Sequence, residues 1–194
     1  PQVLSHFPES GSLANWSDPI WVDFTQFMDE NISPEQVILT AGNGSQIPAL
    51  VTMDSSNLLI QPTMSLPSYD SLTVLLQSSM TNLAGVGLDG NMNGDPDGSP
   101  SDEFSWSFYT ALAGDYDLTG AIDIFDSELF VAAWKNQGTQ SPEAYEMWPR
   151  TGEVPDLTIQ PDGVMDISDL SSFIFQWNWA WNSGLNRPVL AKSS

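Results

Sequence analysis

Acidic residues at metal-ligand spacing mark the segment from residue 115 to 126. A calcium loop of the EF-hand type needs oxygen ligands at positions 1, 3, 5, 9 and 12, a backbone carbonyl at position 7 and glycine at position 6. Gly120 takes the glycine position, and the ligands would be Asp115, Asp117, Thr119, the Ala121 carbonyl, Asp123 and Asp126. This spacing predicts a calcium site, because carboxylates so close together would otherwise repel one another. The alternative is a polar turn before a helix that Asp126 caps.

A second acidic loop has less regular spacing. With Gly163 at position 6, the later ligands are Asp162, the Val164 carbonyl, Asp166 and Asp169. The first ligand positions then fall on Thr158 and Gln160, or on Asp156 if the loop holds two additional residues. Calcium prefers charged oxygen ligands, so Asp156 is the preferred first ligand and a second ion is expected.

A third acidic stretch, with Asp89, Asn91, Asn93 and Asp95, fits the same pattern through position 9. It then fails, because Pro100 occupies position 12, although Asp102 and Glu103 follow closely. Two interpretations stay open: a third, structural calcium site, or a solvated connection between two strands.

Other chemistry has weaker support. Trp177, Trp179 and Trp181 could stack on a sugar, but their alternate spacing scatters them around a helix and favours packing. His6 has no second histidine and no cysteine to join it in a metal site. Nucleophile elbows, phosphate loops and basic-aromatic patches are absent from the sequence, so no enzyme is expected.

The charge balance is strongly acidic. The chain has 25 Asp and Glu against 4 Lys and Arg, for a formal net charge of −21, and should repel nucleic acid and anionic membranes. Without cysteine, calcium is the natural staple of a small extracellular domain. No stretch approaches the roughly 20 apolar residues of a membrane span, and the chain begins at Pro1 without a signal-like region. We therefore expect a piece of a longer secreted or surface-attached protein.

Short alternating segments indicate that residues 1–110 form an antiparallel β-sandwich. Ile20, Val22 and Phe24 would share one face of a strand, as would the three aromatic residues of the segment 104–108. The predicted strands are residues 3–7, 20–24, 37–40, 47–53, 57–61, 72–77 and 104–109.

This half resembles a bacterial Ig-like domain. The resemblance rests on Phe7-Pro8-Glu-Ser-Gly11, Val22-Asp-Phe24 with Phe27-Met28-Asp29, the segment 58–62 and the closing Phe104-Ser-Trp-Ser-Phe108. It implies a spacer or presentation domain.

Beyond residue 113 two amphipathic helices are expected, each directly after an acidic loop. Their apolar positions are Leu129, Phe130, Ala133 and Trp134 in one, and Leu170, Phe173, Ile174 and Trp177 in the other. The segment 120–126 returns at 163–169, an internal duplication with an offset of 43 residues.

A loop and an exiting helix, present twice over residues 113–181, resemble a dockerin. The resemblance implies two calcium ions, a pseudo-twofold pair of helices and a cohesin domain as partner. Partner contact would fall at loop positions 10 and 11, which are Ile124 and Phe125 in one repeat and Ile167 and Ser168 in the other. Dockerins often carry a Ser/Thr pair there, so these apolar residues would either dock on a partner or pack inside the module.

Together these patterns predict a multidomain chain: an all-β Ig-like sandwich at 1–110, a small α-helical calcium module at 111–185 and a tail at 186–194. The predicted function is non-catalytic, calcium-dependent protein–protein docking presented on an Ig-like spacer of a secreted protein. One alternative is a calcium-rigidified, adhesin-like cap packed on the Ig-like domain. The other is a carbohydrate-binding module.

Overall fold

The computed structural model describes residues 1–138 and 142–184, so the predicted tail at 186–194 lies outside the described residues. The chain forms two compact units. The first unit consists of Pro1–Ser12, Asp18–Met64 and Ser71–Phe108. The second consists of Leu13–Ser17, Ser65–Asp70 and the chain from Tyr109 onward, so two short N-terminal segments belong with the C-terminal helices.

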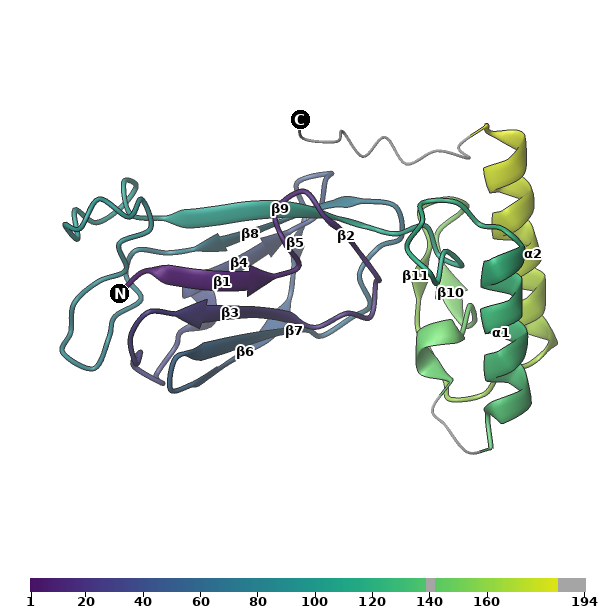
Figure 1. Cartoon of the computed structure of the whole chain (residues 1–194), viewed down its shortest axis with the longest axis horizontal. Coiled ribbons are helices and arrows are strands. Elements are labelled where there is room, and N and C mark those ends of the chain that lie inside the picture. Colours follow the sequence, from purple (N-terminus) through teal and green to yellow (C-terminus); the bar gives the residue numbers. More distant parts are fainter. Residues whose placement is uncertain (139–141, 185–194) are drawn as a thin grey trace. The chain divides into compact units, whose positions relative to one another are not determined.

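Strands β1 to β9 form two sheets (Figure 1). One sheet is antiparallel, in the order β1-β3-β7-β6: Val3–Phe7, Ile20–Phe24, Asn57–Pro62 and Ala49–Asp54. The other has the order β2-β9-β8-β4-β5: Leu13–Ala14, Phe104–Thr110, Ser71–Leu76, Val37–Thr40 and Gln46–Ile47. A single 3-10 turn, η1 (Pro34–Gln36), leads into β4, and β2 pairs in parallel with Tyr109 and Thr110 of β9.

Alternating side chains build the core of the first unit. Every second residue of β3 and of β8 is buried, as the sequence pattern predicts for a strand with one face on a core. Ile20, Val22, Leu72, Val74 and Leu76 are fully buried. The predicted β-sandwich is consistent with this architecture.

The second unit is not the purely helical module that the sequence suggested. It has two helices, α1 (Ile124–Asn136) and α2 (Ile167–Asn182), a 3-10 turn η2 (Glu143–Tyr145) and a two-stranded hairpin, β10 (Arg150–Thr151) with β11 (Thr158–Ile159). Each helix begins at an aspartate N-cap, Asp123 for α1 and Asp166 for α2. Both caps form capping boxes that satisfy backbone N–H groups of the first turn.

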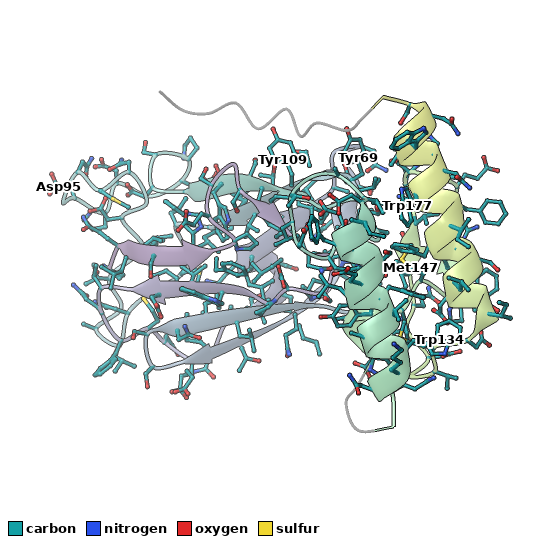
Figure 2. All side chains as sticks on the ribbon, turned by 45° about the vertical axis from the view of Figure 1, so that its right-hand side comes forward. Tyr69, Asp95, Tyr109, Trp134, Met147 and Trp177 are labelled. Atoms are coloured by element: carbon teal, nitrogen blue, oxygen red, sulfur yellow. The ribbon has the colours of Figure 1, made fainter. Side chains whose placement is uncertain are left out.

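Aromatic side chains join the two helices. The Phe130 ring of α1 stacks on the Phe173 ring of α2 with centroids 5.0 Å apart, and both side chains are buried. Met147, labelled in Figure 2, is fully buried in the same unit. Ile174, predicted to face inward, is exposed instead, and the buried face of α2 continues through Gln176 and Ala180.

Phe173→Ala should destabilise the second unit by about 3–5 kcal/mol, because a large buried ring is lost and a cavity remains. Phe175→Ala is the matched control: its side chain is exposed and its loss should change the free energy of unfolding by no more than about 0.5 kcal/mol. Chemical denaturation followed by helix circular dichroism measures both. Equal effects of the two variants would contradict this packing.

Candidate metal centre

The first acidic loop brings three carboxylates together. One oxygen each from Asp115, Asp117 and Asp126 lies within 4.8 Å of the others. Asp115 and Asp126 are buried, whereas Asp117 is exposed. The cluster therefore sits at the surface with two of its three carboxylates turned inward.

Backbone N–H groups hold these carboxylates in place. Asp115 accepts hydrogen bonds from the N–H groups of Thr119 (3.0 Å) and Gly120 (2.8 Å). Asp126 accepts one from Tyr116 at 2.7 Å and, with its other oxygen, one from Asp123 at 2.8 Å. These bonds close the loop onto the first turn of α1.

Burial, together with the nearby Asp126 and Asp117 carboxylates, raises the pKa of Asp115 to about 7, although backbone hydrogen bonds from Gly120 and Thr119 act to lower it. Burial also raises the pKa of Asp126. A bound cation favours the ionised form of such a buried carboxyl group and lowers its pKa.

The other predicted ligands of this loop have mixed roles. The Asp123 carboxylate accepts from the Phe125 N–H at 2.8 Å, so it caps α1 and is not among the three clustered carboxylates. Thr119 is exposed, and its hydroxyl lies 3.4 Å from the Ala121 carbonyl oxygen.

In the second loop, Glu146 stands where Asp115 stands in the first. Its Oε2 accepts from the N–H groups of Asp162 (2.7 Å) and Gly163 (3.1 Å), the counterparts of Thr119 and Gly120. Glu146 is fully buried, and its Oε1 accepts no hydrogen bond from any part of the chain that the structure describes. Burial raises its pKa, and the Asp169 and Asp162 carboxylates raise it further.

Asp169 completes the correspondence with Asp126. Its Oδ1 accepts from the N–H groups of Met147 and Trp148, at 2.8 and 2.9 Å, and its Oδ2 accepts from Asp166 at 2.8 Å. Asp166 in turn caps α2, as Asp123 caps α1. The same pattern of hydrogen bonds from backbone N–H groups to carboxylates is thus present in both loops.

The hairpin β10–β11 lies between Glu146 and Asp162 in the chain and holds the residues predicted as first ligands. Thr158 pairs with Thr151 in the hairpin, and the Gln160 N–H donates to the Pro149 carbonyl. Asp156 is exposed between the strands. Glu146, and not Asp156 or Thr158, therefore accepts the backbone hydrogen bonds that Asp115 accepts in the first loop. Sequence spacing alone could not identify Glu146, because the inserted hairpin lengthens the segment between Glu146 and Asp162.

The residues predicted to contact a partner are mostly exposed. Ile124, Phe125 and Ile167 expose 58%, 61% and 68% of their surface, and Ser168 is half-buried. Ile124 and Phe125 therefore lie on the surface of the second unit and do not pack inside it.

The three tryptophans of α2 have three different surroundings. Trp177 packs edge-on against Phe173, and Trp179 lies edge-on to Tyr69. Trp181 is exposed. They do not present one flat stacking surface.

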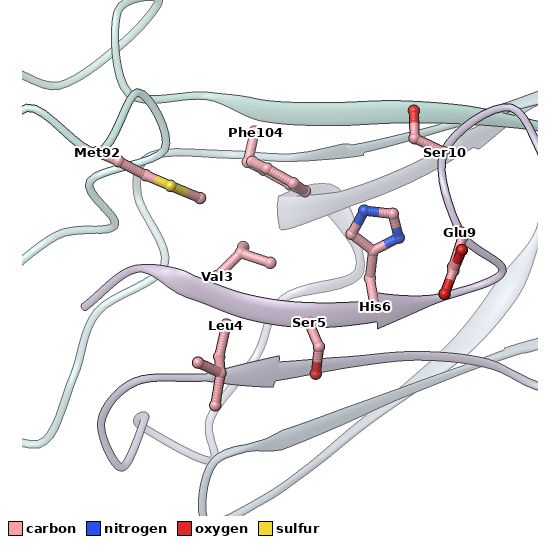
Figure 3. Close-up of a pocket in the computed structure, with 8 residues that line it drawn as sticks. All are labelled: Val3, Leu4, Ser5, His6, Glu9, Ser10, Met92 and Phe104. Atoms are coloured by element: carbon pink, nitrogen blue, oxygen red, sulfur yellow. The ribbon is translucent and has the colours of Figure 1, made fainter. Parts of the chain in front are cut away.

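A surface pocket of about 330 Å³ in the first unit contains His6, Glu9 and Met92 (Figure 3). The His6 Nδ1 lies 2.8 Å from the Pro8 carbonyl oxygen, and its ring packs against Trp106 with centroids 4.4 Å apart. Among the described residues, no group of three metal-ligating side chains includes His6. The pocket therefore holds no second cluster of three His, Asp or Glu side chains at metal-ligand distance.

No protein-family model and no curated protein sequence matches the chain. Similar solved structures include PcoC, a methionine-rich copper resistance protein from Escherichia coli, at 16% identity and a TM-score of 0.42, over 57% of this chain and 97% of that one. CopC from Methylosinus trichosporium OB3b matches at 12% identity and a TM-score of 0.38, over 56% and 90%. L,D-transpeptidase 3 from Mycobacterium tuberculosis matches at 14% identity and a TM-score of 0.36, over 58% of this chain and only 38% of that one.

These comparisons contradict the predicted family. The neighbours are copper-resistance and L,D-transpeptidase chains, so the resemblance to a dockerin behind an Ig-like domain, with cohesin binding, is wrong. The second loop also differs from the predicted repeat in its structure. A hairpin interrupts it, and Glu146, which precedes the hairpin, accepts the hydrogen bond from the Asp162 N–H. At these TM-scores the neighbours carry no argument for a shared activity.

Across the described residues, no helix is both long and apolar enough to span a membrane.

In chelator, the free energy of unfolding of the second unit should fall as the pH rises from about 4 to about 7. The raised pKa of Asp115 means that the folded state binds more protons than the unfolded state in this window, so stability is greatest below it and is lost as the pH rises through about 7. Denaturation between pH 4 and 8 measures the slope. Asp115→Asn should flatten it, and the exposed control Asp54→Asn should not; an unchanged slope in Asp115→Asn would contradict the assignment.

Proposed function

We propose that the second unit is a non-catalytic calcium-binding module whose folding depends on the ion. The observation that carries the proposal is the cluster of Asp115, Asp117 and Asp126 within 4.8 Å, with two members buried. The ion would be held by these carboxylates with the Thr119 hydroxyl and the Ala121 carbonyl. Gly120, at a φ of 82°, adopts the left-handed conformation that the sharp turn of such a loop requires.

The donor atoms favour calcium over other metals. Every candidate ligand is a hard oxygen, and the chain has no cysteine and one histidine, which disfavours zinc and copper. The copper named for PcoC therefore has no counterpart in this cluster. Magnesium binds with few protein ligands and keeps its waters, whereas calcium accepts the six to eight oxygens that such loops supply.

A second ion would bind in the second loop. Glu146 and Asp169 are both buried and take the same backbone hydrogen bonds as Asp115 and Asp126. Asp162 and the Val164 carbonyl would supply further oxygens. The raised pKa of Glu146 and its unpaired Oε1 fit a carboxylate whose partner is a cation.

Calcium binding would make the helix pair available as a docking surface for a protein partner. The ion neutralises the buried carboxylates, so its binding free energy becomes folding free energy. Ile124, Phe125 and Ile167, at the first turns of the two helices, are the exposed apolar residues that a partner would cover. Millimolar calcium outside cells suits an extracellular location for such a module.

Calcium titration of the full chain by isothermal calorimetry tests the proposal. We expect binding to the second unit with a gain of helix in far-ultraviolet circular dichroism, and a rise in its melting temperature because the ion binds only the folded state. Asp115→Asn should weaken binding at the first site by at least about tenfold. Absence of any calcium-dependent change in helix content or melting temperature would overturn the proposal.

The second site is tested by Glu146→Gln, with Asp156→Asn as the matched control. Glu146→Gln should remove one bound ion, because the buried carboxylate is lost while the side-chain shape is kept. Asp156→Asn removes the same charge from the exposed hairpin and should leave the stoichiometry unchanged. Native mass spectrometry counts the ions. Loss of an ion in Asp156→Asn but not in Glu146→Gln would contradict the role of Glu146 and would support Asp156 as the first ligand, as the sequence spacing predicts.

A further inference from the structure

The acidic loop at the end of the first unit, residues 89–102, contains a buried carboxylate without a full set of partners. Asp102 is fully buried, and its Oδ1 accepts no hydrogen bond from any residue in the described ranges 1–138 and 142–184. Its Oδ2 accepts from the Gly98 N–H at 2.7 Å, so the carboxylate is turned toward the loop. An ionised carboxylate in this position needs a compensating positive charge.

The start of this loop repeats the turn of the first metal loop. Asp89 accepts from the N–H groups of Asn93 (3.1 Å) and Gly94 (2.9 Å), as Asp115 does from those of Thr119 and Gly120. The Asn93 N–H also donates to the Asn91 side-chain oxygen at 2.9 Å, as that of Thr119 does to Asp117. Oxygens of Asp89 and Asn91 thus converge on one N–H.

The backbone conformations agree as well. Met92 and Leu118, each at the fourth position of its loop, have positive φ angles of 60° and 57°. Such angles are uncommon for these residue types, so the side-chain hydrogen bonds hold the same strained turn twice. Gly94 and Gly120 follow at the glycine position, with φ angles of 94° and 82°.

The backbone of Asp102 lies beside the start of the loop. Gly90 packs its backbone against the Asp102 carbonyl oxygen, and the Asn91 side chain donates to the Ser101 carbonyl at 3.1 Å. The loop therefore folds back and carries Asp102 to its beginning, past Pro100. Asp95 lies on the same loop (Figure 2).

No side-chain cation from the neighbouring sequence can balance this charge. Residues 1–134 contain neither lysine nor arginine, and the loop itself carries Asp89, Asp95, Asp97, Asp102 and Glu103. Asp89 is also buried, and its Oδ2 accepts a hydrogen bond from the Gln2 side-chain amide at 2.6 Å. An amide, Asn91, stands in place of the carboxylate Asp117, so this loop has fewer charged ligands than the first.

We propose that the loop 89–102 of the first unit binds a divalent cation of the calcium type, held by Asp89, Asn91, Asn93 and Asp102 with the Asp95 carbonyl. The site is independent of the helical unit and of its function. It fastens the long connection between β8 and β9 to the end of the sandwich.

Calcium alone, added to the full chain, is the probe. The chain carries Asp115→Asn and Glu146→Gln, so that the helical unit binds calcium more weakly than in the parent chain. Amide resonances of Asn93 and Gly94 should shift on titration, and calorimetry should find one ion. Adding Asp102→Asn should weaken binding by at least about tenfold, and the exposed control Asp54→Asn should leave it unchanged.

Asp102→Asn should also change the melting temperature of the first unit in opposite directions without and with calcium. In chelator it should raise the melting temperature of the first unit, because it removes a buried charge, while it abolishes the rise that calcium causes in the parent chain. Asn91→Ala changes an exposed position and should weaken binding without altering the buried core. It is the variant to use if Asp102→Asn fails to fold. Unmoved resonances of residues 89–98 at millimolar calcium would overturn the proposal, whatever the helical unit does.

Discussion

Buried carboxylates held by backbone N–H groups are the interaction on which the second unit depends. Asp115, Asp126, Glu146 and Asp169 are all buried, and each receives two or more of these hydrogen bonds. Hydrogen bonds to backbone donors favour the ionised form, but desolvation and mutual repulsion oppose it. The raised pKa values of Asp115, Asp126 and Glu146 show that desolvation dominates in the absence of a cation.

The same carboxylates determine where the helices begin. Asp126 and Asp169 occupy the third position of α1 and α2 and close the capping boxes with Asp123 and Asp166. A carboxylate in the first turn is also stabilised by the positive end of the helix dipole. Each helix therefore starts from its loop, and the Phe130–Phe173 contact then joins the two helices into one core. Loop electrostatics and helix packing are parts of a single arrangement.

The sequence was sufficient to predict those elements whose structure depends on local residue patterns. The alternation in β3 and β8 and the duplicated segment before each helix correctly predicted the main strands and both helices, since strand faces and N-caps depend on near neighbours. The cluster of Asp115, Asp117 and Asp126 was predicted for the same reason, because these carboxylates lie within one short segment.

Spacing failed where partners are distant in the chain. Glu146 reaches the second loop across a hairpin, and Asp102 returns past Pro100, so neither fits a fixed register. The orientation of α2 was also only partly predicted, because a buried glutamine, Gln176, replaces the apolar Ile174 on its inner face. The family assignment failed because two short loop motifs do not define a family over the whole chain.

The hairpin between Glu146 and Asp162 gives the two loops different routes of assembly. In the first loop the chain closes over five residues, from Asp115 to Gly120, so its turn forms from local sequence alone. In the second, the chain closes over seventeen residues, from Glu146 to Gly163, and pairing of β10 with β11 brings those ends together. Loop-closure entropy makes the longer closure more costly by roughly 1 kcal/mol. We therefore expect the first loop to close before the second, whose closure requires the hairpin to have formed.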